Sequence, residues 1–213
     1  MFLRKTPTTE SALPGHPQGH EISGVHFVDG SPMVPPFGEE IEIVYLAMGC
    51  FWGAERIFWE LPGVYTTAVG YTGGFTENAS YEDVCTGRTG HAEAVMVAYD
   101  PEVIPLDRVL KRFWEEHDPT QGNRQGNDVG SQYRSAIYWV TGSQRDDALR
   151  SREVYGTALH DGGFGEITTE ITEAGEFYYA EEYHQQYLAK NPGGYCNHGF
   201  CQIEYTSTLA ANG

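Results

Sequence analysis

Basic residues are scarce in this chain. Lysine and arginine together number 13, against 30 aspartates and glutamates, which leaves a formal net charge of −17. A surface that acidic repels phosphate groups and anionic lipids. We therefore expect neither a nucleic acid nor a membrane among its partners.

Cysteine is also rare, with four in 213 residues. That number is too small for a fold held together by disulfides, and a reducing compartment is then the default. We expect a cytoplasmic protein in which cysteine chemistry is catalytic rather than structural.

Long apolar runs are absent as well. The longest nearly apolar run covers residues 43–54, which is shorter than the roughly 20 residues of a membrane-spanning helix. The opening MFLRKTPTTE has basic residues but is not followed by an apolar stretch of roughly 7–15 residues, so we expect no secretory signal.

What the chain does contain is enough apolar material for one core, with 40% hydrophobic and 13% aromatic residues. Residues 1–40 hold six of the 11 prolines and show no regular period, which predicts an extended or partly disordered N-terminal arm. Residues 41–193 are expected to form a single domain. Residues 194–213 are expected to form a mobile tail that carries two of the cysteines.

Hydrophobic periodicity within 41–193 predicts alternating strands and helices. The expected strands cover 43–47, 64–69, 92–99, 133–140 and 167–171, and the expected helices cover 54–61, 106–117, 143–160 and 180–190. Ser143 followed by Asp146 is typical of a capping box. The order predicts an α+β fold, a two-layer sandwich with a mixed sheet, a split β-α-β core and helices on one side. The glycine-rich segments 70–90 and 120–131 are expected to be functional loops.

Cys50 lies at the junction of the first predicted strand and helix, in the sequence GCFWG. Gly49 permits a sharp turn, and the start of a helix favours a thiolate. Phe51 and Trp52 cannot both point into the core from a helix start. At least one of them should therefore line a surface pocket beside the sulfur.

Five segments together carry a resemblance to a known family. They are GCFWG (49–53), GYTGG (70–74), YEDVCTGRTGHAEAV (81–95), FWEEHDPTQGNRQGNDVGSQYRSAIY (113–138) and AEEYHQQYLAKNPGGYC (180–196). In this order they resemble the A-type peptide methionine sulfoxide reductases over residues 41–196. The resemblance implies an enzyme that reduces methionine-S-sulfoxide, protein-bound or free, to methionine. It implies no cofactor and no metal.

The family's chemistry requires a nucleophilic thiolate and a proton donor for the departing sulfoxide oxygen. Cys50 matches the first and Glu93 the second. Glu93 shares one face of the strand 92–99 with Val95 and Val97. A carboxyl on an apolar face should have a raised pKa and be protonated near neutrality.

The resemblance also implies a substrate site. Phe51 and Trp52 would form the methyl pocket, Tyr81 and Tyr133 would offer hydroxyls to the sulfoxide oxygen, and Asp128 would help to place the substrate. Tyr187 is a weaker match. Cys85 is expected to be a packing residue, and His91 and His184 are expected to make hydrogen bonds within the scaffold.

Two tail cysteines complete the expected chemistry. Reduction leaves Cys50 as a sulfenic acid, which Cys196 would convert to a disulfide. Cys201 is a candidate to pass that disulfide outward, although only four residues separate it from Cys196. Thioredoxin or a similar dithiol would recycle a monomeric enzyme.

Three other chemistries are open to the same residues. Cys196 and Cys201 could hold zinc, although no second pair lies nearby. Cys50 could serve a hydrolase with a distant His and Asp. It could also serve a thiol peroxidase, which needs no aromatic methyl pocket.

Overall fold

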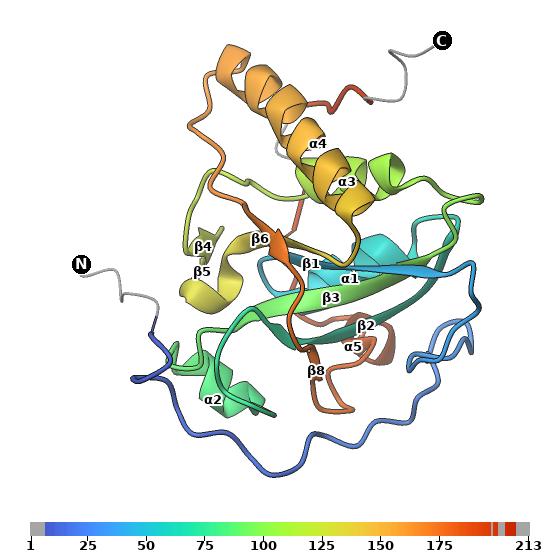
Figure 1. Ribbon diagram of the computed structural model, residues 1–213, viewed down its shortest axis with the longest axis vertical. Helices are drawn as coiled ribbons and strands as arrows, with labels where there is room; N and C mark the ends of the chain where they lie inside the picture. The colour runs from blue at the N-terminus through green and yellow to red at the C-terminus, as the bar shows by residue number, and fades with distance from the viewer. Residues whose placement is uncertain (1–6, 197, 200–202, 208–213) are drawn as a thin grey trace.

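The computed structural model describes residues 7–196, 198–199 and 203–207. Its main sheet has the strand order β7-β6-β1-β3-β2-β8 (Figure 1). The strands are β1 Glu42–Met48, β2 Val64–Thr72, β3 Ala92–Tyr99, β6 Ser135–Trp139, β7 Glu170–Glu173 and β8 Tyr178–Tyr179. Neighbours are antiparallel except for β6 and β7, which are parallel. The mixed sheet and the central order β6-β1-β3-β2 confirm the predicted α+β class with a split β-α-β core.

Three helices cover one face of this sheet. They are α1 Phe51–Trp59, α3 Leu106–Glu115 and α4 Gly142–Asp161. The pleat of β1 separates the two faces, because alternate side chains point to opposite sides. Val44 and Leu46 join the core cluster that also contains Phe58, Trp114 and Tyr155, one residue from each helix.

The opposite face is covered by chain that is neither helix nor strand. Ala68 of β2 and Met96 of β3 pack against the fully buried Met33, with Phe37 and Phe177 beside them. In Figure 1 the N-terminal segment, in blue, runs along this side of the sheet. The apolar side chains of this segment thus bury the face that the helices leave open.

The helix predicted over 180–190 is wrong over most of its length. Only α5, Tyr187–Lys190, is helical, and turns precede it. Gln186 has a left-handed backbone with a φ of 47°, which no α-helix can contain. The Gln185 side chain bonds the backbone of Val69 instead, accepting its N–H and donating to its carbonyl, both at 2.9 Å. This segment is therefore fastened to β2 by side-chain amides.

The two glycine-rich segments contain short elements that the sequence did not predict. β2 extends to Thr72, and α2, Tyr81–Cys85, follows behind a capping box of Ser80 and Asp83. In the second segment β4 Arg124–Gln125 pairs with β5 Asp128–Val129, and a 3-10 turn, η1, covers Ser131–Tyr133. Because η1 occupies these residues, β6 begins two residues later than predicted. β7 likewise lies at Glu170–Glu173 instead of 167–171.

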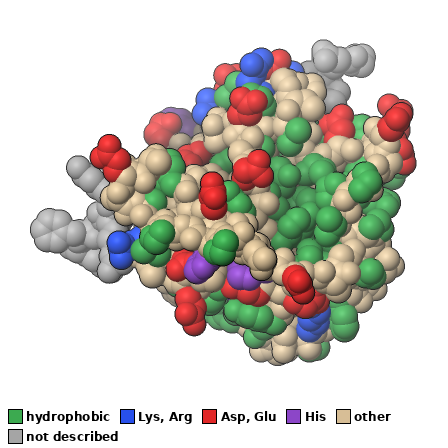
Figure 2. Space-filling view, turned by 60° about the horizontal axis from the view of Figure 1, so that its bottom comes forward, with side chains coloured by type: hydrophobic (Ala, Val, Ile, Leu, Met, Phe, Trp, Pro, Cys, Tyr) green, Lys and Arg blue, Asp and Glu red, His purple; other side chains and the backbone are tan. Residues whose placement is uncertain are grey.

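The surface agrees with the composition. Acidic side chains are spread over the face in Figure 2, and basic ones are few. No helix within the described residues has both the length and the apolar character to cross a membrane.

The capping box of α4 lies two residues before the predicted one. Thr141 is the N-cap, and its hydroxyl accepts the Gln144 N–H at 3.3 Å. Gln144 returns the bond, because its Oε1 accepts the Thr141 N–H at 3.2 Å. Its Nε2 also donates to the carbonyl of Ile43 in β1, which fixes the start of the helix against the sheet. The predicted box at Ser143 and Asp146 is wrong because both residues are already inside the helix.

Thr141→Ala should destabilise the protein by about 1 kcal/mol, since it leaves an N–H of the first turn without its acceptor. Ser143→Ala is the matched control, because Ser143 is exposed and caps no N–H. It should change stability by less than about 0.5 kcal/mol. Urea unfolding of both variants measures the difference. Equal losses would contradict the assignment of the cap.

Candidate active site

Cys50 lies at the turn between β1 and α1. Gly49 adopts a φ of 102° there, and a Cβ at this position would lie 2.7 Å from the Gln125 side chain. Both facts require glycine. Cys50 is the N-cap residue of α1 and is 8% exposed, so the thiol is held beside the first backbone amides of the helix.

Glu93 reaches this junction from the middle of the sheet. It lies on β3 opposite Tyr71 of β2 and is 2% exposed. Its Oε2 accepts the backbone N–H of Phe51 at 3.0 Å. The carboxyl therefore lies beside the residue that follows the thiol, on the apolar face that the sequence predicts.

Burial sets the protonation of both groups. It raises the pKa of Glu93 to about 8, with a smaller contribution from Asp128, while the Phe51 N–H acts in the opposite direction. Burial likewise raises the pKa of the Cys50 thiol, and the charges of Glu93 and Asp128 add to this. The predicted lowering by the helix start is present, through the amides of Trp52 and Gly53, but burial outweighs it. At neutral pH Glu93 is mostly protonated and thus repels a thiolate little.

Phe51 and Trp52 take different places, as the sequence predicts. Phe51 is 1% exposed and packs in the core beside Tyr71. Trp52 is partly exposed, stacks on Tyr187 at a centroid distance of 3.9 Å, and donates its indole N–H to His184 Nδ1 at 2.9 Å. The indole is therefore held in one orientation at the surface. The scaffold role predicted for His184 agrees with this bond.

Three further candidates lie around the thiol and the carboxyl. Tyr81 is the first residue of α2, Tyr133 ends η1 and Asp128 begins β5. Burial raises the pKa of both tyrosines, and the charge of Glu93 contributes to each shift. Their hydroxyls are therefore protonated donors at neutral pH. The structure thus brings together residues that come from both glycine-rich segments.

Two further residues lie near this site. Cys85 is exposed, so the predicted packing role is wrong, and its sulfur interacts with the Tyr81 hydroxyl. Glu181 accepts the Tyr71 hydroxyl at 3.0 Å and the Tyr81 N–H at 2.9 Å. It joins β2 to the start of α2, a link that no local sequence pattern indicates.

The tail crosses the start of α1. Cys196 Sγ lies 2.9 Å from where a Cβ on Gly53 would stand, and Arg56 donates to it from Nη2 at 3.4 Å. His198 contacts the Met48 carbonyl through Nε2 at 2.8 Å. Cys196 thus lies on the helix that Cys50 caps, and both are free thiols. Cys201 lies outside the described residues.

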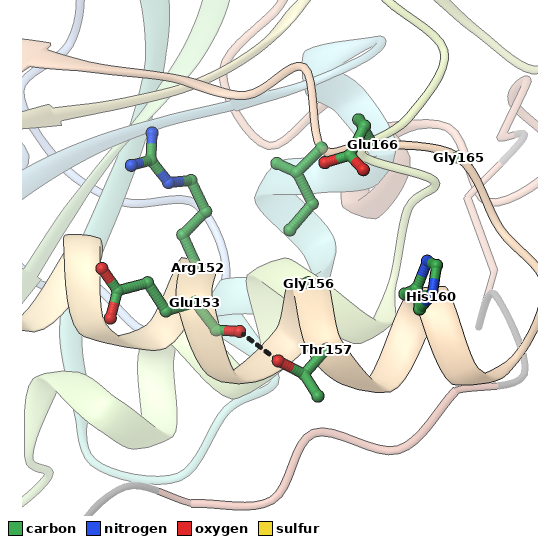
Figure 3. A pocket seen from close by; sticks show the side chains of 8 residues that line it. Arg152, Glu153, Gly156, Thr157, His160, Gly165 and Glu166 are labelled. Carbon is green, nitrogen blue, oxygen red and sulfur yellow. Dashed lines mark hydrogen bonds between the residues drawn. The ribbon is translucent and has the colours of Figure 1, made fainter.

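Within the described part of the chain, no three His, Cys, Asp or Glu side chains form a group that could hold a metal ion. A separate hollow of about 600 Å³ lies between α4 and the loop after it, lined by Arg152, Thr157, His160 and Glu166 among others (Figure 3). It contains none of the predicted site residues. Thr157 in its wall donates its hydroxyl to the Glu153 carbonyl within the same helix.

Comparisons with known proteins agree with this geometry. The family described as Peptide methionine sulfoxide reductase matches residues 42–209. Peptide methionine sulfoxide reductase MsrA of Brucella anthropi is 60% identical over 92% of this chain and 90% of its own length. MsrA 1 of Synechocystis is 55% identical, over 93% of this chain and 90% of that protein.

Solved structures agree in fold. Methionine sulfoxide reductase A of Corynebacterium diphtheriae matches with a TM-score of 0.84 and 44% identity, over 93% of this chain and 99% of the other. Reduced Mxr1 of Saccharomyces cerevisiae matches with a TM-score of 0.71 and 34% identity, over 83% of this chain and 98% of the other.

A buried thiol at a helix start, next to a buried protonated carboxyl, is typical of a cysteine-dependent enzyme, and the matching family is one of oxidoreductases. The match over residues 42–209 and the identity of 60% are specific enough to go further. The chain belongs to the peptide methionine sulfoxide reductase family.

Glu93→Gln should change how stability depends on pH. A carboxyl whose pKa rises from 4.5 to about 8 on folding binds more protons in the folded state between these values. Wild-type stability should therefore fall as pH rises through this window, by up to about 1.4 kcal/mol per pH unit from this residue. Glu93→Gln keeps the acceptor for the Phe51 N–H and removes the titration. Urea unfolding at pH 6 and pH 8 should show the variant gaining stability relative to wild type, and an unchanged difference would contradict the raised pKa.

Proposed function

We propose that the chain reduces methionine-S-sulfoxide, free or within oxidised proteins, to methionine, with Cys50 as the nucleophile. The observation that carries this proposal is the position of Glu93, a buried and protonated carboxyl bonded to the N–H next to Cys50. The preference for the S epimer follows from membership of the family, since each epimer has its own enzyme class.

In the first step the Cys50 sulfur attacks the sulfoxide sulfur while Glu93 donates a proton to the oxygen, and the proton that the Cys50 thiol loses restores the Glu93 carboxyl. The oxygen moves to Cys50, so that a thiol and a sulfoxide become a sulfenic acid and a thioether. The raised pKa of Glu93 supports this role, because the proton is present at neutral pH. The hydroxyls of Tyr81 and Tyr133 would donate to the same oxygen, and Asp128 would orient the substrate.

The substrate's methyl group would lie against Trp52, with the buried Phe51 behind it. Stacking on Tyr187 and the bond to His184 hold the indole in one orientation, so the apolar wall exists before substrate binds. A preformed wall favours a methyl sulfoxide over peroxide or an ester, and this supports the reductase over the peroxidase and hydrolase alternatives.

The second step would convert the Cys50 sulfenic acid and the Cys196 thiol to a disulfide and water. The contact of Cys196 with Gly53 and Arg56 of α1 supports this pairing. Thioredoxin or a similar dithiol would then reduce the disulfide, with Cys201 as a candidate to pass it outward. Mxr1 of yeast has been solved in complex with Trx2. The scarcity of cysteine supports the cytoplasm as the compartment.

Glu93→Gln should lower the rate of methionine formation by about 10²–10⁴-fold, the usual value of a general acid. Rapid-mixing assays of a single turnover with a methionine-S-sulfoxide peptide measure that step directly. Cys50→Ser is the control and should form no methionine, because a neutral alcohol does not replace a thiolate. A Glu93→Gln rate within about threefold of wild type would reject Glu93 as the general acid, since that loss corresponds to less than about 1 kcal/mol.

Cys196→Ser should still form one methionine per enzyme but fail to turn over with thioredoxin, because no disulfide is made. Mass mapping after one turnover should find a Cys50–Cys196 disulfide in wild type and a Cys50 sulfenic acid in the variant. Cys85→Ser is the matched control and should recycle normally. Normal recycling of Cys196→Ser would remove Cys196 from the proposal. If Cys201→Ser recycles at the wild-type rate, the relay ends at Cys196.

A further inference from the structure

His198 lies against the junction that carries Cys50. Its Nε2 is 2.8 Å from the Met48 carbonyl oxygen, and a carbonyl can only accept, so Nε2 carries the ring hydrogen. The other ring nitrogen, Nδ1, is then a free lone pair. It is shielded from solvent and has no hydrogen-bond partner among the residues that the structure describes.

This free nitrogen faces the same place as the Cys196 thiol. A Cβ on Gly53 would overlap His198 Nδ1 and would lie 2.9 Å from Cys196 Sγ. Gly53 is three residues after Cys50, and residues three apart lie on the same side of a helix. Cys196 and His198 therefore approach α1 on the side of Cys50. Glycine at this position leaves the room in which both tail groups approach the helix.

Burial and a nearby positive charge keep the ring of His198 neutral. Arg56 donates from Nη2 to Cys196 Sγ at 3.4 Å. Burial and the same guanidinium lower the pKa of His198 to about 4, although the bond to Met48 opposes them. Arginine has no acceptor atom, so it cannot take the proton of Cys196.

We propose that His198 Nδ1 accepts the Cys196 proton when the disulfide closes, an inference that rests on the proposed resolving role of Cys196. The Cys196 sulfur bonds to the Cys50 sulfur while the S–O bond of the Cys50 sulfenic acid breaks. The proton passes from Cys196 Sγ to Nδ1 and then to the departing hydroxyl, which leaves as water. The ring ends neutral, and the step needs no other reactant.

The test separates methionine formation from disulfide closure in one turnover without reductant. His198→Gln is the first variant, because its amide can still donate to the Met48 carbonyl but has no basic nitrogen. It should form methionine at the wild-type rate and close the Cys50–Cys196 disulfide about 100-fold more slowly. His160→Gln makes the same exchange at an exposed position on α4 and should close at the wild-type rate. Acid-quenched mass spectrometry follows both products.

His198→Ala allows a test by chemical rescue with imidazole. Rescue would fail if His198 only anchored the tail to the Met48 carbonyl. Added imidazole should restore part of its rate of disulfide closure and should leave methionine formation unchanged. Closure by His198→Gln within threefold of wild type would overturn the inference, and so would slow closure that imidazole does not restore. If wild type forms methionine but no Cys50–Cys196 disulfide, the resolving step itself is wrong, and the role of His198 is rejected with it.

Discussion

The hydrogen bond from the Phe51 N–H to Glu93 joins the first turn of α1 to the middle of β3. The first turn of a helix leaves backbone N–H groups without partners inside the helix, and the carboxyl satisfies one of them. Because Glu93 is on a buried strand paired on both sides, its position follows from the sheet register. The same bond places the carboxyl beside Cys50, so the fold and the chemistry depend on one contact.

Burial then determines what these two groups can do. It raises the pKa of the carboxyl and of the thiol together. Glu93 therefore keeps its proton at neutral pH, and a smaller fraction of Cys50 is present as thiolate. The neutral carboxyl limits this loss of thiolate, because a charged carboxylate would repel the sulfur anion. The amides of Trp52 and Gly53 offset a further part of the desolvation. Glu93 is thus mostly protonated at neutral pH, and burial disfavours a permanently ionised thiol.

The orientation of the Trp52 indole depends on a second buried carboxyl. Glu55 of α1 is fully buried, and its oxygens accept the Gln186 N–H at 2.8 Å and the Gln186 side chain at 2.6 Å. These bonds hold the left-handed Gln186 and therefore the next residue, Tyr187, which stacks on Trp52. Burial raises the pKa of Glu55 to about 7. Glu55 and Trp52 both belong to α1. The helix thus holds its own indole in place through a segment that lies about 130 residues further along the chain.

Local pattern in the sequence determined the order of the main strands and helices, the position of Cys50 at a helix start and the buried side of Glu93. Each depends on neighbours within a few residues, through a glycine turn or a period of 2 or 3.6. Only the tertiary structure decided that His184 holds Trp52, that turns precede α5 and that Cys196 and His198 both lie against Gly53. The Gln185 bonds to Val69 join residues 116 apart. Such contacts override local helix periodicity, because a buried amide must find its partner wherever the fold provides one.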